Sequence, residues 1–262
     1  LYLKDRIYQF FKLEKFKYGK NSKDIAICII CRDDAECLIE NIEYHSLIGV
    51  DHFIIYDNDS AIPLAKVLRG YKNVTVINLP AKNLKQSLCY LDCLNKFKSK
   101  FKWIGFIDTD EFIVLKNIDK HSKNKALSDF LKPYEKYGGV GINWLCFGSS
   151  GHTKTQKNVI KSFTHARLDH KENTFFKSIV NTKYVLSPSR NAHAFIYKQG
   201  YFCVNENFQN ISLKTKWFYA PLINDQNHEK IQLNHYVTRS REDFELKRVR
   251  CKHNAYWDVR LS

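Results

Sequence analysis

The sequence predicts an α/β protein built on a mostly parallel β-sheet. From residue 24 onward, short apolar runs alternate with segments of helical periodicity, which is typical of βαβ units. Acidic clusters follow two of the apolar runs, where ligands bind in open parallel sheets. The 262 residues, 44% hydrophobic and 26% charged, suit one large globular domain and argue against a disordered or transmembrane chain.

The first half of the chain alternates predicted strands and helices in a regular order. Acidic residues favour a helix start after residue 32, Gly49 favours its end, and Pro63 favours the first turn of the next helix. In the third helix we expect Leu84, Leu88, Leu91 and Leu94 to form the buried side. The predicted strands are residues 25–31, 52–57, 73–80 and 102–107, and the predicted helices are residues 32–49, 63–71 and 84–100.

After Gly139 the alternation gives way to a less regular pattern. Residues 139–147, 174–181, 183–187 and 194–204 read as short strands, mainly antiparallel. A last helix should start after Ser240, which with Asp243 has the spacing of a capping box. We therefore expect one domain in two halves, 24–138 and 139–262, preceded by a basic, aromatic segment over residues 1–23.

The net charge of +15 predicts attraction to polyanions, but it does not choose among nucleic acid, membrane surfaces and phosphorylated small molecules. A nucleic-acid-binding module is disfavoured because the aromatic residues fall inside strand patterns and no known module signature is present. No signal peptide is visible in the first twenty residues, and no apolar run reaches the roughly 18 residues of a membrane span.

The eight cysteines are predicted to be buried free thiols. Cys28 and Cys31 form a C-x-x-C, but positions three apart in a strand point to opposite faces. No second C-x-x-C follows, and no Cys/His pair has the spacing of a zinc finger. Free thiols favour a reducing compartment, so we expect a cytoplasmic protein.

The stretch KWIGFIDTDEFIVL, residues 102–115, places three carboxylates at the end of a buried strand. In extended backbone Asp108 and Asp110 would project together, with Thr109 and Glu111 pointing elsewhere. Two carboxylates on one side favour a hard divalent cation that is shared with substrate phosphates. The alternative is a carboxylate pair that caps a loop by accepting hydrogen bonds from backbone N–H groups.

Four blocks of the sequence together resemble glycosyltransferase family 92, formerly domain of unknown function 23, within the GT-A, family-2-like glycosyltransferases. The blocks are CIICRDDAECLIENIEYHSLIGVDHFIIYDNDS, KWIGFIDTDEFIVL, INWLCFGSSGH and LNHYVTRSREDFELKRVR. The resemblance covers residues 25–250 and implies a GT-A fold: a Rossmann-like, mostly parallel sheet flanked by helices, with a more irregular C-terminal half that carries antiparallel strands and a final helix. Residues 24–138 would bind the nucleotide-sugar, and residues 139–262 would form the acceptor side.

The resemblance also implies roles for individual residues. Asp108 and Asp110 match the family's Asp-x-Asp and would hold Mn²⁺ or Mg²⁺ against the donor diphosphate, and His235 would add a further metal contact. Cys31-Arg32-Asp33 stands where the family usually has a polar triplet such as Lys-Asn-Glu. The residues expected at the donor are Arg32, Asp33, Asp57, Asn58, Gln86, Asp108, Lys177 and Arg239.

An inverting transfer also needs a general base at the acceptor hydroxyl. Asp169 is our first candidate and Glu111 the alternative, while Asp225 and Glu229 stay open. Trp144, with Gly148 and Gly151, is expected in the wall around the sugar or acceptor, and His193 is a further candidate.

The expected activity is transfer of a sugar, galactose from UDP-galactose as the best guess, to a glycan or lipid-linked glycan. We expect a peripheral enzyme on the inner face of a membrane, in lipopolysaccharide or surface-glycan synthesis, that binds no nucleic acid. The alternatives are a nucleotidyltransferase, an inactive transferase-like scaffold, and a basic nucleic-acid-binding protein.

Overall fold

The computed structural model describes residues 23–79, 85–116, 123–211 and 227–250. The predicted N-terminal segment therefore lies outside the described residues, apart from Lys23. Within the described ranges, no helix is long and apolar enough to cross a membrane.

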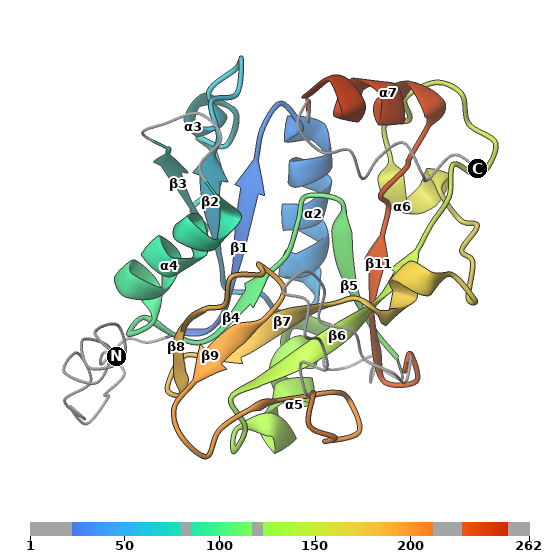
Figure 1. Cartoon of the computed structure of the whole chain (residues 1–262). Helices are drawn as coiled ribbons and strands as arrows, with labels where there is room; N and C mark the ends of the chain where they lie inside the picture. Colours follow the sequence, from blue (N-terminus) through green and yellow to red (C-terminus); the bar gives the residue numbers. More distant parts are fainter. Residues whose placement is uncertain (1–22, 80–84, 117–122, 212–226, 251–262) are drawn as a thin grey trace, which may run out of the picture.

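A curved nine-stranded sheet organises the molecule (Figure 1). Its path runs β3-β2-β1-β4-β7-β6-β11-β5, and β10 pairs with β6 beside this path. The bounds are β1 Lys23–Cys31, β2 His52–Asp57, β3 Val74–Asn78, β4 Phe101–Phe106, β5 Glu111–Leu115, β6 Gly139–Cys146, β7 Phe176–Asn181, β10 Cys203–Val204 and β11 Ile231–His235. A separate hairpin joins β8 Val185–Pro188 to β9 Phe195–Tyr197.

The sheet is parallel in the first half of the chain and mixed in the second, as predicted. Strands β3, β2, β1 and β4 are parallel neighbours. Strand β7 then pairs antiparallel with both β4 and β6, so one continuous sheet carries the strands of both halves. Strand β11 is parallel to β6 and antiparallel to β5, which forms the far edge.

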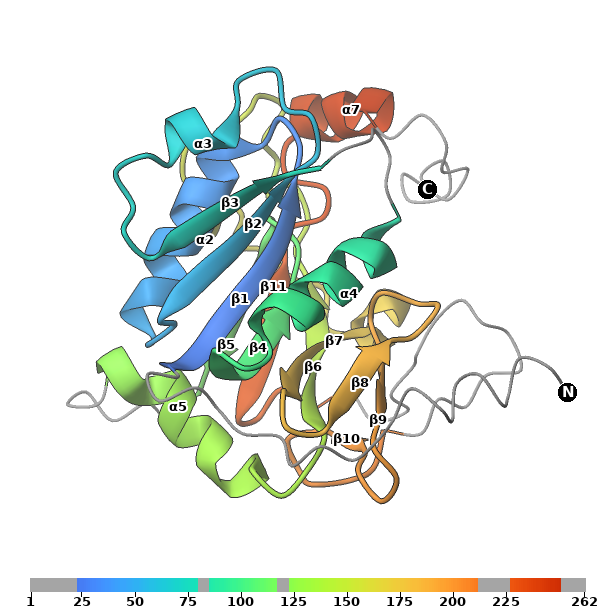
Figure 2. The ribbon, with the colours of Figure 1, turned by 90° about the vertical axis from the view of Figure 1, so that its left-hand side faces the viewer.

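Helices cover both faces of the parallel part of the sheet (Figure 2). The helices are α2 Ala35–Leu47, α3 Leu64–Val67, α4 Gln86–Phe97, α5 Ala126–Leu131, α6 Val159–Ser162 and α7 Arg241–Arg250, with short 3₁₀ turns η1 Lys123–Lys125, η2 Lys132–Tyr134 and η3 Lys171–Thr174. In β1, Ile27 packs in the core with Leu38 of α2, whereas Cys28 packs in the opposite core with Tyr90 of α4. The near-continuous apolar strand is thus explained by burial on both sides.

The predicted buried side of the third helix was wrong in part: Leu94 is buried as expected, but Leu88 is not. Leu88 of α4 is 49% exposed, and Leu84 lies outside the described residues. The helix is rotated so that its larger aromatic side chains meet the sheet, with the Tyr90 ring 4.5 Å from that of Phe106. The buried residues are Cys89, Tyr90, Cys93, Leu94 and Phe97.

The described cysteines are buried, as predicted. Cys28, Cys37, Cys89, Cys93 and Cys203 are free thiols. Cys28 and Cys31 pack in different cores on the two faces of the sheet, so the C-x-x-C does not bring its sulfurs together. Burial raises the pKa of Cys28, which keeps its thiol protonated. Cys251 lies outside the described residues.

Candidate active site

The acidic segment forms a tight turn between β4 and β5. The Glu111 N–H donates to the Asp108 carbonyl oxygen at 3.2 Å. The expectation of extended backbone was therefore wrong, because the chain must reverse here to send β5 to the far edge of the sheet. Glu111 does not point away either: its Oε2 accepts the Asp108 N–H at 2.8 Å and braces the turn.

Asp108 is held by one buried cation and one amide. Its Oδ2 accepts from Lys177 Nζ at 2.9 Å, and its Oδ1 accepts from Gln86 Nε2 at 2.9 Å. Burial by itself would raise the pKa of Asp108, but the Lys177 ammonium outweighs burial and the pKa lies below its ordinary value. Lys177 Nζ is also 3.8 Å from Glu111 Oε2. The structure thus brings together three residues predicted at the donor: Asp108, Lys177 of β7 and Gln86 of α4.

Asp110 faces a second pair of nitrogen groups. Lys247 Nζ of α7 donates to its Oδ2 at 2.7 Å, and His235 Nε2 lies 3.7 Å from its Oδ1. Burial lowers the pKa of His235 to about 3, so its ring is neutral and keeps a lone pair. The Trp144 ring lies 4.2 Å from the His235 ring and forms an apolar wall beside this carboxylate.

A cavity of about 360 Å³ is lined by the loops after β1 and β2, by the segment 155–159 and by Arg239, and by none of the residues of the acidic turn. Asp34, at its wall, accepts from Arg239 Nη1 at 2.9 Å and from Nη2 at 2.6 Å. The same carboxylate accepts from Thr109 Oγ1 at 2.6 Å, and Thr109 stands between the two aspartates of the turn. Arg239 has a left-handed backbone, φ 49°, which is unusual for a side chain with a Cβ. The hydrogen bond between Asp34 and Thr109 therefore connects the cavity wall to the turn that carries Asp108 and Asp110.

The loops after β1 and β2 form another side of the cavity. The Asp33 N–H donates to Ser60 Oγ at 3.1 Å, and Asp33 Oδ1 accepts the Ala61 N–H at 2.7 Å. Asp33, Ser60 and Ala61 all line the cavity. The loops after β1 and β2 thus contact each other directly at the cavity.

Of the predicted donor residues in these loops, Asp57 has side-chain partners that need no ligand, whereas Asn58 Oδ1 is buried with no hydrogen-bond partner among the described residues. Both oxygens of Asp57 accept backbone hydrogens, from Ser60 at 3.0 Å and from Leu64 at 2.8 Å. The Asn58 N–H donates to the Cys31 carbonyl oxygen, and Arg32 Nε lies 3.8 Å from Asp33 Oδ2. Their contact with a nucleotide stays a prediction.

The candidates for the general base lie in different surroundings. Asp169 is an exposed side chain paired with Arg167, with Nε 2.8 Å from Oδ1. Within the described ranges no contact joins it to the acidic turn. Glu111 is fully buried, and burial raises its pKa well above the ordinary value. Glu229 is exposed, and Asp225 lies outside the described residues. The base stays a prediction.

Of the residues expected in the sugar or acceptor wall, Trp144 of β6 and His193 lie side by side. His193 Nδ1 lies 2.8 Å from the Phe176 carbonyl oxygen and must donate there, since a carbonyl only accepts. Its ring lies edge-on to Trp144 at 5.3 Å, and burial lowers the pKa of His193 to about 4. Gly151, at φ 81°, has open space around its α-carbon, so backbone there is accessible.

Sequence reasoning missed the hydrogen bonds by which Asp34 and Asn41 fix the acidic turn. Asp34 was not among the predicted site residues, although its neighbours Arg32 and Asp33 were. Thr109 was predicted only to point away from Asp108 and Asp110. Asn41 Nδ2 donates to the carbonyl oxygens of Thr109 and Glu111, at 3.1 and 2.7 Å. The sequence did contain a signal for Asn41, because an amide on the apolar side of a predicted helix needs a buried hydrogen-bond partner.

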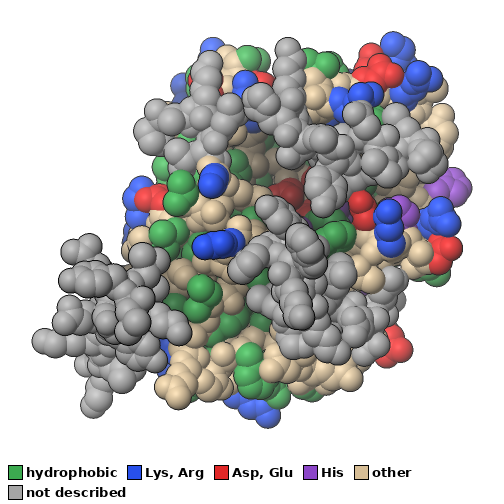
Figure 3. Space-filling view, in the orientation of Figure 1, with side chains coloured by type: hydrophobic (Ala, Val, Ile, Leu, Met, Phe, Trp, Pro, Cys, Tyr) green, Lys and Arg blue, Asp and Glu red, His purple; other side chains and the backbone are tan. Residues whose placement is uncertain are grey.

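The surface view agrees with these contacts. In Figure 3 acidic side chains lie set back near the centre of the face, with Lys and Arg side chains around them. A small anionic patch inside a basic surface is the arrangement expected where a cation and a polyphosphate meet.

The residues fit the divalent cation that the resemblance implies. Two carboxylates supply hard oxygen ligands. The neutral His235 ring supplies nitrogen: its Nε2 is the atom near Asp110, and its Nδ1 has no hydrogen-bond partner among the described residues. The Lys177 and Lys247 ammonium groups already balance both carboxylates, so a metal would share Asp108 and Asp110 with them.

Fold and site together define an α/β glycosyltransferase of the GT-A type: a parallel sheet, an Asp-x-Asp turn beyond it and a cavity connected to that turn through Asp34. The model of the family described as Glycosyltransferase family 92 matches residues 23–255. The chain belongs to glycosyltransferase family 92.

Relatives agree with this assignment. A family 92 protein of Oryza sativa subsp. japonica is 32% identical over 197 residues, which is 72% of this chain and 32% of the relative. One of Arabidopsis thaliana is 30% identical over 207 residues, 74% of this chain and 35% of the relative. The chain thus spans about a third of the length of these curated relatives.

A solved structure with a weaker likeness is a mannosyltransferase from Pyrobaculum calidifontis in complex with GDP-Man and Mn²⁺. It is 10% identical, has a TM-score of 0.36, and the match covers 54% of this chain and 42% of that one. This likeness is too low to support a statement about function.

Proposed function

We propose that the protein is a metal-dependent, inverting hexosyltransferase that uses a nucleotide-sugar, with UDP-galactose as the best candidate donor. The observation that carries this proposal is the link from Asp110 and Asp108, through Thr109 and Asp34, to the cavity at the ends of β1 and β2. The nucleotide would occupy the cavity and its diphosphate would reach the carboxylate turn.

Asp108, Asp110 and His235 would hold Mn²⁺ or Mg²⁺, and the bound ion would supply positive charge for the leaving diphosphate. The chain adds fixed cations of its own. Lys177 and Lys247 lie against the two carboxylates, and Arg239 is held at the cavity wall. Such preorganised charges stabilise developing negative charge without reorganising during the reaction.

The acceptor side would lie along Trp144 and His193. The Trp144 ring beside the proposed metal site would pack against the apolar face of a sugar. Polar groups such as His193 would orient the sugar hydroxyls. For the base we keep Asp169 as the first candidate and Glu111 as the alternative. Because Glu111 is buried and braces the turn, its substitution would also disturb Asp108.

A transferase-like scaffold is the second candidate function. The specific observation in its favour is that an ammonium group already neutralises each carboxylate of the turn. A protein that uses these ion pairs only for stability would bind donor weakly or not at all, and metal would not alter that.

The deciding experiment measures UDP release and donor binding by calorimetry, across UDP-, GDP- and CMP-sugars, with Mn²⁺ and with EDTA. We expect one donor to respond, in Mn²⁺ only, and Asp110→Asn to lose at least 100-fold in activity. Asp129→Asn is the matched control, since Asp129 pairs with Lys132 at an exposed surface. A well-folded, metal-supplemented protein with no donor response would support the scaffold instead.

We further propose that the basic surface rests on an anionic membrane at the cytoplasmic side, where a lipid-linked acceptor for lipopolysaccharide or surface glycan would be presented. The net charge of +15 supports this, since each basic residue near such a surface adds about 1 kcal/mol. Flotation with vesicles containing anionic lipid should show binding at low salt that is lost at high salt. Absence of binding at low salt would contradict the proposal.

A further inference from the structure

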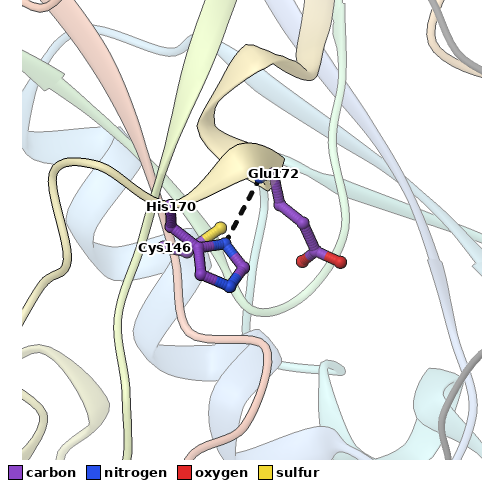
Figure 4. A group of neighbouring side chains, drawn as sticks. All are labelled: Cys146, His170 and Glu172. Atoms are coloured by element: carbon purple, nitrogen blue, oxygen red, sulfur yellow. Dashed lines mark hydrogen bonds between the residues drawn. The ribbon is translucent and has the colours of Figure 1, made fainter. Parts of the chain in front are cut away.

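A second cluster of ligand-type side chains lies at the end of β6 (Figure 4). Cys146 Sγ, a His170 ring nitrogen and a Glu172 carboxylate oxygen all lie within 4.8 Å of one another. Cys146 and Glu172 are buried, and His170 is partly buried. Figure 4 shows the Cys146 sulfur beside the imidazole, with the Glu172 side chain extending from the same short turn.

We propose that Cys146, His170 and Glu172 bind a zinc ion that fastens the 167–175 loop to β6. Thiolate, imidazole and carboxylate are the three ligand types of protein zinc sites. A thiolate is too soft a ligand for Mg²⁺ or Ca²⁺, so the cluster differs in kind from the oxygen-rich Asp108–Asp110 turn. Three protein ligands leave the fourth position to water or a further ligand.

The distances are compatible with a zinc site after a small adjustment. Zinc bonds of about 2.0–2.3 Å at tetrahedral angles place ligand atoms about 3.3–3.8 Å apart. The three ligand atoms, within 4.8 Å of each other, would have to approach by up to roughly 1.5 Å. Side-chain rotations can supply this movement, because two of the ligands stand only two residues apart on one turn.

The state of His170 suits metal binding. Its Nδ1 lies 3.3 Å from the Glu172 backbone nitrogen, whose N–H can only donate, so Nδ1 is the acceptor in this contact. A 3.3 Å contact is long for a hydrogen bond and cheap to exchange. Nδ1 is therefore the ligand atom that zinc would use.

The backbone around the ligands is fixed by Asn173, which is fully buried. Its Oδ1 accepts the Cys146 N–H at 2.9 Å, and its Nδ2 donates to the carbonyl oxygens of Arg167 and Leu168, at 2.8 and 3.0 Å. The Arg167 N–H in turn donates to the Cys146 carbonyl oxygen at 3.3 Å. One amide thus ties the ligand-bearing loop to the ligand-bearing strand, as outer-shell groups do in metal sites.

The test uses Co²⁺ as a coloured substitute for zinc, with excess Mg²⁺ present to occupy oxygen-only carboxylate sites. We expect one equivalent of Co²⁺ to produce a thiolate-to-cobalt absorption band, and one equivalent of Zn²⁺ to bleach it. Cys146→Ala should abolish the band. Cys89→Ala, which removes another buried cysteine, and Asp110→Asn should both keep it.

Asn173→Ala tests the positioning role without touching a ligand. We expect it to keep the band but to weaken metal affinity about 10-fold or more. In the same series, Zn²⁺ should raise the melting temperature of the parent and of Asp110→Asn, and should not raise that of His170→Ala. No band in the folded parent protein, or a band that persists in Cys146→Ala, would overturn the proposal.

Discussion

At the residue scale, Lys177 explains how two of the three carboxyl groups of the acidic turn, those of Asp108 and Glu111, are tolerated. The ammonium group is 2% exposed and lies 2.9 Å from Asp108 and 3.8 Å from Glu111. Burial by itself would lower the pKa of Lys177, but the neighbouring carboxylates outweigh burial and the pKa is raised. A buried ammonium group beside the Asp108 and Glu111 carboxyl groups thus stabilises the turn.

Lys177→Met should therefore be strongly destabilising. Removing Lys177 takes a charged hydrogen-bond partner from Asp108 and should cost about 1.5–3 kcal/mol, less than in a fully buried pair, because the Asp108 side chain is 37% exposed. Denaturation by urea at pH 7 measures this loss. Lys132→Met is the control, because Lys132 forms an exposed pair with Asp129, and should cost less than about 1 kcal/mol. Equal losses in the two variants would contradict the assigned role.

The cost of Lys177→Met should also depend on pH. The pKa of Asp108 is depressed in the folded protein, so its ion pair stabilises the fold above the ordinary carboxyl pKa of about 3.9. That contribution is lost as the pH falls through the depressed folded value. The difference between parent and variant should thus narrow below about pH 4, and a pH series of unfolding midpoints would detect it.

At the scale of elements, α2 completes the open edge of the sheet. β5 ends the strand order, so within the described ranges one edge of its backbone has no neighbouring strand. Side chains of α2 take that place: Tyr44 donates to the Ile113 carbonyl oxygen at 2.9 Å, and His45 Nε2 accepts the Ile113 N–H at 3.1 Å. This helix, which follows β1, therefore positions the strand that follows the acidic turn.

His45 makes this contact sensitive to pH. Its Nε2 must stay unprotonated, and burial lowers the pKa of His45 to about 4. As the pH falls, the unfolded chain binds the proton first, so stability present above about pH 6.5 is lost toward pH 4. Between pH 8 and pH 5 we expect His45 to contribute a loss of about 2 kcal/mol in unfolding free energy.

Urea unfolding of His45→Gln across this pH range checks the prediction. The variant should show a flatter pH dependence than the parent, whatever its absolute stability. His165→Gln, which alters an exposed histidine, should keep the parent's slope. A His45→Gln slope as steep as the parent's would show that the ring does not titrate as described.

Helix α7 begins at the predicted capping box. Ser240 Oγ accepts the Asp243 N–H at 3.0 Å, and Asp243 Oδ2 accepts the Ser240 N–H at 3.3 Å. Ser240→Ala should cost about 1 kcal/mol, measured by thermal or chemical unfolding. Ser240→Thr keeps the hydroxyl and should retain most of the stability. A Thr variant as unstable as the Ala variant would rule out the cap as the cause.

At the scale of the whole molecule, the pairing of β4 with β7 joins the halves. Ile179 of β7 is opposite Gly105 of β4 and also opposite Val140 of β6. It is 1% exposed. A single sheet with a shared core at this seam should unfold as one unit.

Ile179→Ala should cost about 3 kcal/mol, as for other large-to-small changes in a core. Hydrogen exchange with mass spectrometry should show the same loss of protection in β1 and in β6, which belong to different halves. Ile196→Ala is the control, since Ile196 is 52% exposed. Loss of protection confined to β6 would mean that the halves unfold separately.

The sequence by itself determined the fold class and the core of the candidate site. Apolar runs of strand length, helical periodicity and Gly49 or Pro63 at element ends are local signals, and local backbone preferences decide them. The Asp-x-Asp was also visible in the sequence, because carboxylates inside an apolar segment are costly to bury without a partner. The capping box of α7 was found from two residues of one turn.

Only the tertiary structure decided which side chains meet across the fold. Lys177 and Lys247 reach the acidic turn from β7 and α7, and Asn41 and His45 reach β5 from α2. The rotation of α4 and the reversal at Asp108 follow from packing and strand order, which periodicity does not encode. The Cys146–His170–Glu172 cluster likewise depends on one loop folding back onto β6, so its ligands lack the short, regular spacing by which a metal site is recognised in a sequence.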